Sequence, residues 1–335
     1  MKVTRRNFLK ALAAAGAATA MTACGASETE GAKTLNLKLA HTLAEDHAVH
    51  IALLGFAESV KEKTAGAVNI EVVPNGVLGS ETDMISQIQA GALDMCKVSA
   101  SALGNFNPIW NALSVPYVFD NQEHYYGVMD GEVAASLYTA TESDGFRGLT
   151  WLDSGARSFY TANNAIRTPA DLKGLKIRTM DSQIAIDMMT CLGGSATVLG
   201  YSDIYTGMQQ GVVDGAENNV TALRDHGDVT KFYCFDEHTR IPDIVVISSN
   251  IWNNLTDEQR EIMTTCAKET TDGYKTAWKD FEDEVLSTAV EKNGIELIHD
   301  VDIAAFQEAV QPIYEDLKAN SPDVYAVVEK IRAQA

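Results

Sequence analysis

The strongest constraint on the fold is an order of elements that the sequence contains twice. Each copy predicts a strand, a helix, a second strand, a helix that begins at a serine and ends at a glycine, and a third strand. The first copy covers segments 35–40, 46–63, 68–73, 80–91 and 93–98, and the second covers 175–179, 182–192, 196–199, 202–211 and 212–217. Strands that alternate with helices favour parallel sheets. The duplication therefore predicts two α/β lobes.

Polar residues lie at or just past the ends of the predicted strands of both copies. They are His41, Lys97, Ser99, Arg178, Glu217 and Asn218. Ligands of open α/β sheets bind outside the carboxyl ends of the strands. Two lobes whose strand ends face each other form a clamshell with a solute between them. We expect residues 35–153 and 244–282 in the first lobe, and residues 154–243 and 283–335 in the second.

A long helix is predicted to span both lobes. Thr256-Asp257-Glu258-Gln259 is a capping box, and helical spacing continues from it to Asn293-Gly294. At about 1.5 Å per residue such a helix reaches about 55 Å. Gly273 leaves two shorter helices as an alternative. The β-branched run at 241–248 predicts a strand that returns the chain to the first lobe, and 295–298 predicts another strand.

The first 24 residues predict an export signal rather than part of the fold. Thr4-Arg5-Arg6-Asn7-Phe8-Leu9-Lys10 matches the twin-arginine signal, and the apolar stretch at 11–23 is too short to span a bilayer. Met21-Thr22-Ala23-Cys24 resembles a lipoprotein cleavage box, with Met21 where leucine is usual. We expect a periplasmic or cell-surface protein, with Cys24 as a lipid anchor and 25–34 as a flexible tether.

Charge and cysteine usage exclude several classes of function. The formal net charge of -20 argues against nucleic-acid binding, which needs clustered lysine and arginine. Cys96, Cys191, Cys234 and Cys266 are scattered without a Cys-x-x-Cys motif, so we interpret them as buried thiols. If the protein holds an anion, its positive groups must be concentrated in a cleft.

Two arginines and an asparagine form a candidate carboxylate site. Arg157 and Arg178 each carry a planar fork that matches both oxygens of a carboxylate, and Asn218 directly follows the predicted strand at 212–217. A structural ion pair is the alternative for Arg178, and a turn role is the alternative for Asn218.

The first lobe contributes weaker candidates, namely Glu81, Lys97, Ser99 and His41. Each has a structural alternative. Lys97 could pair with Asp94, Glu81 could favour a helix N-terminus, and His41 could be a satisfied strand-end histidine.

The segment from Thr168 to Asn218 resembles the solute-binding proteins of TRAP (tripartite ATP-independent periplasmic) transporters. The motifs that carry the resemblance are those at 167–178, 201–206 and 210–218, together with Gly76-Val77-Leu78-Gly79-Ser80-Glu81 and Val115-Pro116-Tyr117-Val118-Phe119. The likeness extends over nearly all of the chain after the signal.

The resemblance implies a fold of two α/β lobes with a long helix across both, and a membrane permease as partner. It implies that Arg178 is the principal carboxylate ligand, Arg157 a second positive group and Asn218 an amide donor. Tyr201 occupies the position of the family's aromatic wall. Ala216 and Asn219 stand where the family often has glutamine and proline.

The polar residues of the first lobe favour a sugar acid such as a uronate over a plain dicarboxylate. Ser154-Gly155-Ala156-Arg157-Ser158-Phe159-Tyr160-Thr161 also resembles members that take uronic acids. We expect a binding protein without cofactor or metal, not an enzyme. The alternatives are a dicarboxylate-binding protein, a binding protein of an ATP-driven importer, and an exported hydrolase using Glu81 and Glu217 as acid and base.

Overall fold

The computed structural model describes residues 34–335. The export signal, Cys24 and all of the predicted tether except Thr34 lie outside the described residues.

Two sheets, one for each copy of the repeated plan, form the centre of the molecule. The first has the order β2 (Val68–Val73), β1 (Leu35–Ala40), β3 (Met95–Ser99), β10 (Asp243–Ser248) and β4 (Phe146–Leu152). The second has the order β11 (Glu296–Ile298), β9 (Phe232–Thr239), β5 (Arg157–Thr161), β8 (Gly215–Asn218), β6 (Lys176–Thr179) and β7 (Ser195–Val198). Strands that belong to one copy pair in parallel. The prediction of two α/β units is confirmed, and each sheet with its helices is called a lobe below.

Each sheet also contains one antiparallel strand through which the chain passes between the lobes. In the first sheet β10 lies antiparallel between β3 and β4, and in the second β5 lies antiparallel between β8 and β9. The chain leaves the first lobe after β4 and enters the second at β5. It returns from β9 to β10, as predicted from the β-branched run. Residues 153–156 and 240–242 are therefore the two strand crossings.

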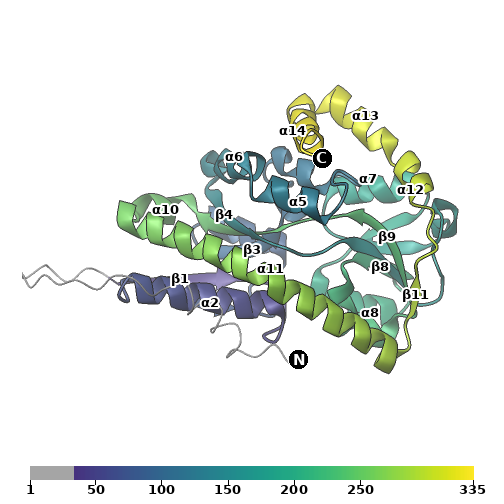
Figure 1. Ribbon diagram of the computed structural model, residues 1–335, viewed down its shortest axis with the longest axis horizontal. Coiled ribbons are helices and arrows are strands. Elements are labelled where there is room, and N and C mark those ends of the chain that lie inside the picture. The colour runs from purple at the N-terminus through teal and green to yellow at the C-terminus, as the bar shows by residue number, and fades with distance from the viewer. Residues whose placement is uncertain (1–33) are drawn as a thin grey trace, which may run out of the picture.

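Helices cover both faces of the two sheets (Figure 1). They are α2 (Ala48–Lys63), α3 (Glu81–Gln89), α4 (Ala100–Leu103), α5 (Gln122–Met129), α6 (Glu132–Ala140), α7 (Gln183–Cys191), α8 (Ile204–Gln209), α9 (Leu223–His226), α10 (Ser249–Asn254), α11 (Asp257–Asn293), α12 (Ile303–Ala309), α13 (Gln311–Asn320) and α14 (Pro322–Arg332). One buried core contains side chains of α2, α8 and α11, and a second contains side chains of α3, α5, α6, α7, α13 and α14.

Helix α11 runs along both lobes without a break (Figure 1). Its capping box forms as predicted, because Thr256 Oγ1 accepts from the Gln259 N–H at 3.2 Å and Gln259 Oε1 accepts from the Thr256 N–H at 3.0 Å. Gly294 ends the helix in the left-handed conformation with φ of 66°. The helix contacts α2 and β4 in the first lobe and α9 in the second. The single long helix is confirmed, and Gly273 lies inside it.

One helix start in the second copy was predicted wrongly. Ser80 caps α3 in the first copy as expected, accepting from the Asp83 N–H at 3.2 Å. Ser202 does not cap its helix, because 201–203 form a 3-10 turn and α8 begins only at Ile204. The side chain of Tyr201 fixes this turn by donating from its hydroxyl to Asp225 Oδ2 at 2.8 Å.

The last helix of the chain, α14, lies on the first lobe. Helix α13 contacts α7, whereas α14 lies against α6 and the 3-10 helix η1 (Pro108–Ser114). The residue boundaries of the lobes remain a prediction. Cys96, Cys234 and Cys266 are buried free thiols, and Cys191 is a free thiol that is only partly buried.

Candidate functional site

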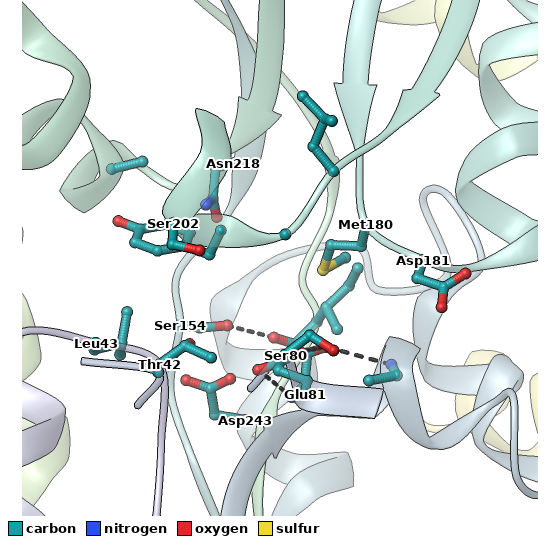
Figure 2. A pocket seen from close by; sticks show the side chains of 18 of the residues that line it. Thr42, Leu43, Ser80, Glu81, Ser154, Met180, Asp181, Ser202, Asn218 and Asp243 are labelled. Atoms are coloured by element: carbon teal, nitrogen blue, oxygen red, sulfur yellow. Dashed lines mark hydrogen bonds between the residues drawn. The ribbon is translucent and has the colours of Figure 1, made fainter. Parts of the chain in front are cut away.

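A cavity of about 430 Å³ lies between the two lobes. Figure 2 shows Thr42, Leu43, Glu81 and Asp243 on one side of it and Met180, Ser202 and Asn218 on the other. The candidate residues that line it are Arg157, Arg178, Asn218, Tyr201, Glu81, Lys97 and Ser99. His41 is not among the lining residues.

Strand register explains why these side chains meet. In the second sheet Asn218, the last residue of β8, pairs with Ser158 beside Arg157, and Arg178 of β6 pairs with Ala216 of β8. In the first sheet Ser99, the last residue of β3, pairs with Asp243, the first residue of β10. Carboxyl ends of the parallel strands and amino ends of the antiparallel strands therefore share the edge that faces the cavity.

Arg178 is a buried cation without an internal counter-ion. Its side chain is 4% exposed, and Nε donates to the carbonyl oxygen of Leu199 at 2.8 Å. None of the arginine ion pairs in residues 34–335 includes it. Burial lowers the pKa of its guanidinium, and the more distant charge of Glu217 opposes this shift. An isolated buried charge is costly, so a buried guanidinium without an ion pair at a cavity is suited to hold an anion.

Arg157 is buried beside it but is already paired. Its Nε and Nη2 lie 2.7 and 2.9 Å from the two carboxylate oxygens of Glu217, and Nη2 also donates to the Glu217 carbonyl at 2.8 Å. Nη1 donates to Asn218 Oδ1 at 2.6 Å. Most donors of this guanidinium are therefore held by the protein.

His238 and Asp236 lie behind the ion pair of Arg157 and Glu217 and hold its carboxylate in place. His238 Nε2 lies 3.3 Å from Glu217 Oε2, and its Nδ1 lies 2.6 Å from Asp236 Oδ2. Burial alone would raise the pKa of Glu217, but Arg157 and His238 lower it to about 2. Burial alone would lower the pKa of His238, but Asp236 and Glu217 raise it to about 9. At neutral pH the four side chains alternate in charge and cancel.

Asn218 is oriented by its neighbours. Its Oδ1 accepts from Arg157 and from the Asn219 N–H at 2.9 Å, so the side-chain nitrogen is the end left to donate. Figure 2 shows this amide at the cavity. The side chain has the geometry expected of an amide donor to a solute.

The first lobe faces these groups with two carboxylates around one lysine. Lys97 Nζ lies 3.0 Å from Asp243 Oδ2 and 3.7 Å from Glu81 Oε1. Burial alone would lower the pKa of the Lys97 ammonium, but the two carboxylates raise it. Glu81 also accepts from the Ser99 N–H at 3.0 Å and from the Ser99 hydroxyl at 2.7 Å. Asp94, the alternative partner of Lys97, instead accepts from the Lys38 N–H.

Asp243 lines the cavity but was not among the residues predicted from the sequence. Its only sequence signal is its place at the start of the β-branched strand at 243–248. Its contact with Lys97 depends on β10 inserting beside β3, a pairing between residues far apart in the chain. Burial raises the pKa of its carboxyl, and Lys97 opposes that shift.

Of the two remaining candidates, Tyr201 lines the cavity and His41 does not. The hydroxyl of Tyr201 is bonded to Asp225. His41 is fully buried behind the wall, where its Nδ1 accepts from the Leu43 N–H at 3.1 Å and its Nε2 lies 2.9 Å from His50 Nδ1. Burial, with the charges of Lys97 and His50, lowers the pKa of His41 to about 3. It fixes the loop that carries Thr42 and Leu43 to the cavity.

Between residues 34 and 335, no three His, Cys, Asp or Glu side chains are grouped so that they could hold a metal ion. The helices of this stretch include none with the length and apolar character needed to cross a membrane.

Two α/β lobes joined by crossing strands and one long helix, with a charged cavity between them, define the clamshell class of solute-binding proteins. Residues 39–320 match the family described as bacterial extracellular solute-binding protein, family 7. The chain belongs to this family, that of the TRAP solute-binding proteins, whose members bind solutes rather than catalyse reactions. Residues 2–22 match the twin-arginine signal sequence, so the chain carries an export signal to the periplasm.

Solved structures of similar proteins agree with the fold. A TRAP periplasmic solute-binding protein from Anaerococcus prevotii with bound D-glucuronate is 35% identical, with a TM-score of 0.85 over 90% of this chain and 99% of that one. One from Sulfitobacter with bound β-D-galacturonate is 35% identical, with a TM-score of 0.86 over 89% of this chain and 99% of that one. The C4-dicarboxylate-binding protein DctB of Bacillus subtilis is 27% identical over 83% of this chain and 80% of its own length.

Proposed function

We propose that this protein captures a sugar acid of the uronate class outside the cytoplasm and delivers it to a TRAP membrane permease. The observation that carries the proposal is the buried and unpaired guanidinium of Arg178 at a cavity whose opposite wall holds two carboxylates.

The acid group of the solute binds at Arg178. A carboxylate there neutralises the only lining arginine that has no ion pair within residues 34–335, and Asn218 offers its side-chain amide to the same group. Arg157 contributes charge to this end of the cavity but few free donors, because Glu217 and Asn218 occupy them. Charge-assisted hydrogen bonds of this kind are roughly twice as strong as neutral ones.

The remainder of the solute faces the first lobe, and this wall favours hydroxyl groups. Carboxylates such as Glu81 and Asp243 only accept hydrogen bonds, so they suit the O–H donors of a sugar. A second carboxylate of a plain dicarboxylate would meet like charge at the same place. The proteins from Anaerococcus and Sulfitobacter that bind uronates support this assignment.

Closure of the lobes is the signal to the permease. The solute joins groups of both lobes, so it stabilises the closed arrangement, and the crossings at 153–156 and 240–242 are where the chain can bend. Gly155 lies in the first crossing with φ of 65°, and a Cβ there would lie 2.2 Å from the carboxylate of Glu282 on α11. The crossing is therefore packed directly against the long helix.

We also propose that Cys24 is lipidated and tethers the protein to the membrane. The match of its surroundings to a lipoprotein cleavage box supports this. Mass spectrometry of the mature protein from membranes tests it. An acylated amino-terminal cysteine is expected, and a mature protein that begins after Cys24 contradicts the anchor.

The function is tested by thermal shift and calorimetry on purified protein that starts near residue 34. The panel contains D-glucuronate, D-galacturonate, D-gluconate, succinate and malate. We expect the uronates to give the largest rise in melting temperature, because a ligand that binds only the folded state stabilises it. Stabilisation by succinate or malate alone would support the dicarboxylate alternative instead.

A further inference from the structure

His47 lines the solute cavity from the first lobe, although no motif of the sequence singled it out. It is the N-cap residue of α2, and its Nδ1 accepts from the Val49 N–H at 3.1 Å. The side chain is only 3% exposed.

The hydrogen bond to Val49 fixes where the proton of the imidazole lies. A nitrogen that accepts a hydrogen bond carries no proton, so in the neutral ring the proton is on Nε2. Burial lowers the pKa of His47 well below its ordinary value, and the neighbouring charges of Lys97 and Arg224 and the rings of His41 and His50 act in the same direction. The ring is therefore neutral, with one tautomer, near pH 7.

The ring is also held in place, and its proton has no protein acceptor. Its centroid lies 4.8 Å from that of Phe281 in an edge-on contact and 6.2 Å from that of Trp278. Within residues 34–335 the one hydrogen bond of this side chain is the bond from Val49 to Nδ1. The Nε2–H is thus a preorganised donor on a residue that lines the cavity.

This donor complements the rest of the first-lobe wall. Glu81 and Asp243 accept hydrogen bonds, and the ammonium of Lys97 lies between them. On the basis of the proposed function, we propose that His47 determines specificity by donating its Nε2–H to an oxygen of the sugar. A hydroxyl group can donate to one of the carboxylates and accept from His47 at once, whereas an apolar carbon at that place leaves the donor unsatisfied.

Two substitutions separate the two nitrogens of His47. In His47→Asn the amide oxygen takes the place of Nδ1 and keeps the helix cap, since asparagine is a preferred N-cap residue, but nothing replaces the Nε2–H. In His47→Gln the amide nitrogen reaches the position of Nε2, but the cap is lost. Calorimetry with D-glucuronate and D-galacturonate, together with thermal unfolding without ligand, measures both effects.

We expect His47→Asn to keep the melting temperature near that of the wild type while uronate affinity falls by about tenfold, the effect of one lost hydrogen bond. His47→Gln should lose melting temperature and keep more of the affinity. In the wild type, the ¹⁵N chemical shifts of the ring should show a protonated Nε2 and an unprotonated Nδ1.

The outcomes distinguish this inference from the function on which it rests. If the wild type binds no uronate, the proposed function fails and the role of His47 fails with it. If the wild type binds a uronate and His47→Asn binds it equally well, only the role of His47 is overturned. The opposite tautomer in the ¹⁵N spectrum also overturns it.

Discussion

The inner charged groups of the two walls of the cavity differ in sign. At the second-lobe wall the buried guanidinium groups of Arg157 and Arg178 lie in front of the carboxylate of Glu217. At the first-lobe wall the carboxylates of Glu81 and Asp243 flank the single ammonium of Lys97. The exposed carboxylates of Asp83, Asp181 and Asp203 also line the cavity. A solute that is anionic at one end and rich in hydroxyl groups at the other matches this polarity. The contrast shows how a protein with a net charge of -20 can hold an anion, because one edge of one sheet gathers the positive groups.

The two arginines of the second wall differ as well. Arg157 has an internal counter-ion in Glu217, and the His238–Asp236 pair lies behind that carboxylate. Arg178 has no ion pair within residues 34–335, and in the proposed function the carboxylate of the solute is its counter-ion. Substitutions near Arg157 should therefore change stability, and substitution of Arg178 should change affinity.

The largest effect is expected for Glu217→Gln. The neutral amide leaves the buried guanidinium of Arg157 without its counter-ion, and breaking a buried pair costs about 3–5 kcal/mol. Denaturant unfolding without ligand should show a loss of that size. A free energy of unfolding equal to that of the wild type would mean that this ion pair does not stabilise Arg157.

Arg178→Lys should reduce uronate affinity by about 100-fold or more, which corresponds to about 3 kcal/mol, because a point ammonium cannot reproduce the planar fork. Calorimetry measures the affinity. The melting temperature without ligand is the matched control and should stay near that of the wild type. A variant with normal affinity removes Arg178 from the site.

The raised pKa of His238, which lies behind the second-lobe wall, predicts that the free energy of unfolding depends on pH. The pKa of His238 is about 9 in the folded protein, raised by Asp236 and Glu217, and about 6.5 in the unfolded chain. Its stabilising contribution is therefore fully present below pH 6.5 and is lost as the pH rises to 9, by about 2–3 kcal/mol. Unfolding at several pH values should show this slope, and His238→Gln should remove it. A slope that survives the substitution belongs to another group.

Asp243→Asn should give the smallest effect and should act on selectivity. Removing one carboxylate from the first wall weakens the repulsion of a second acid group, so binding of succinate relative to D-glucuronate should rise by about tenfold, or about 1.4 kcal/mol. Thermal shift with both ligands measures the ratio. An unchanged ratio would show that this wall does not discriminate by charge.

Local signals in the sequence predicted much of the fold. The capping box at Thr256 and the glycine at 294 predicted both ends of α11. Apolar alternation predicted β1, and a β-branched run predicted β2. The change of lobe after residue 153 was predicted, but strands β4 and β5 were not, because β4 pairs with β10 and β5 with β9, residues far apart in the chain. The start of α8 was missed because the anchored ring of Tyr201 overrides the serine cap.

The candidate site was likewise predicted where local signals were enough and missed where contacts join residues far apart in the chain. The rule that ligands bind at strand ends placed Arg178, Asn218 and Lys97 at the cavity. The sequence does not show which charged side chains pair with one another. It left Glu217 as a possible catalytic acid, whereas in the structure Glu217 is the partner of Arg157. His41 was a candidate because it ends a strand, whereas His47, six residues later, is the histidine that lines the cavity.

The most direct test of this account is a crystal structure of the protein with bound D-glucuronate. We predict the carboxylate at the guanidinium of Arg178, with the sugar hydroxyls directed to Glu81 and Asp243. A carboxylate bound at Lys97, with Arg178 paired to an acid of the protein, would contradict the account.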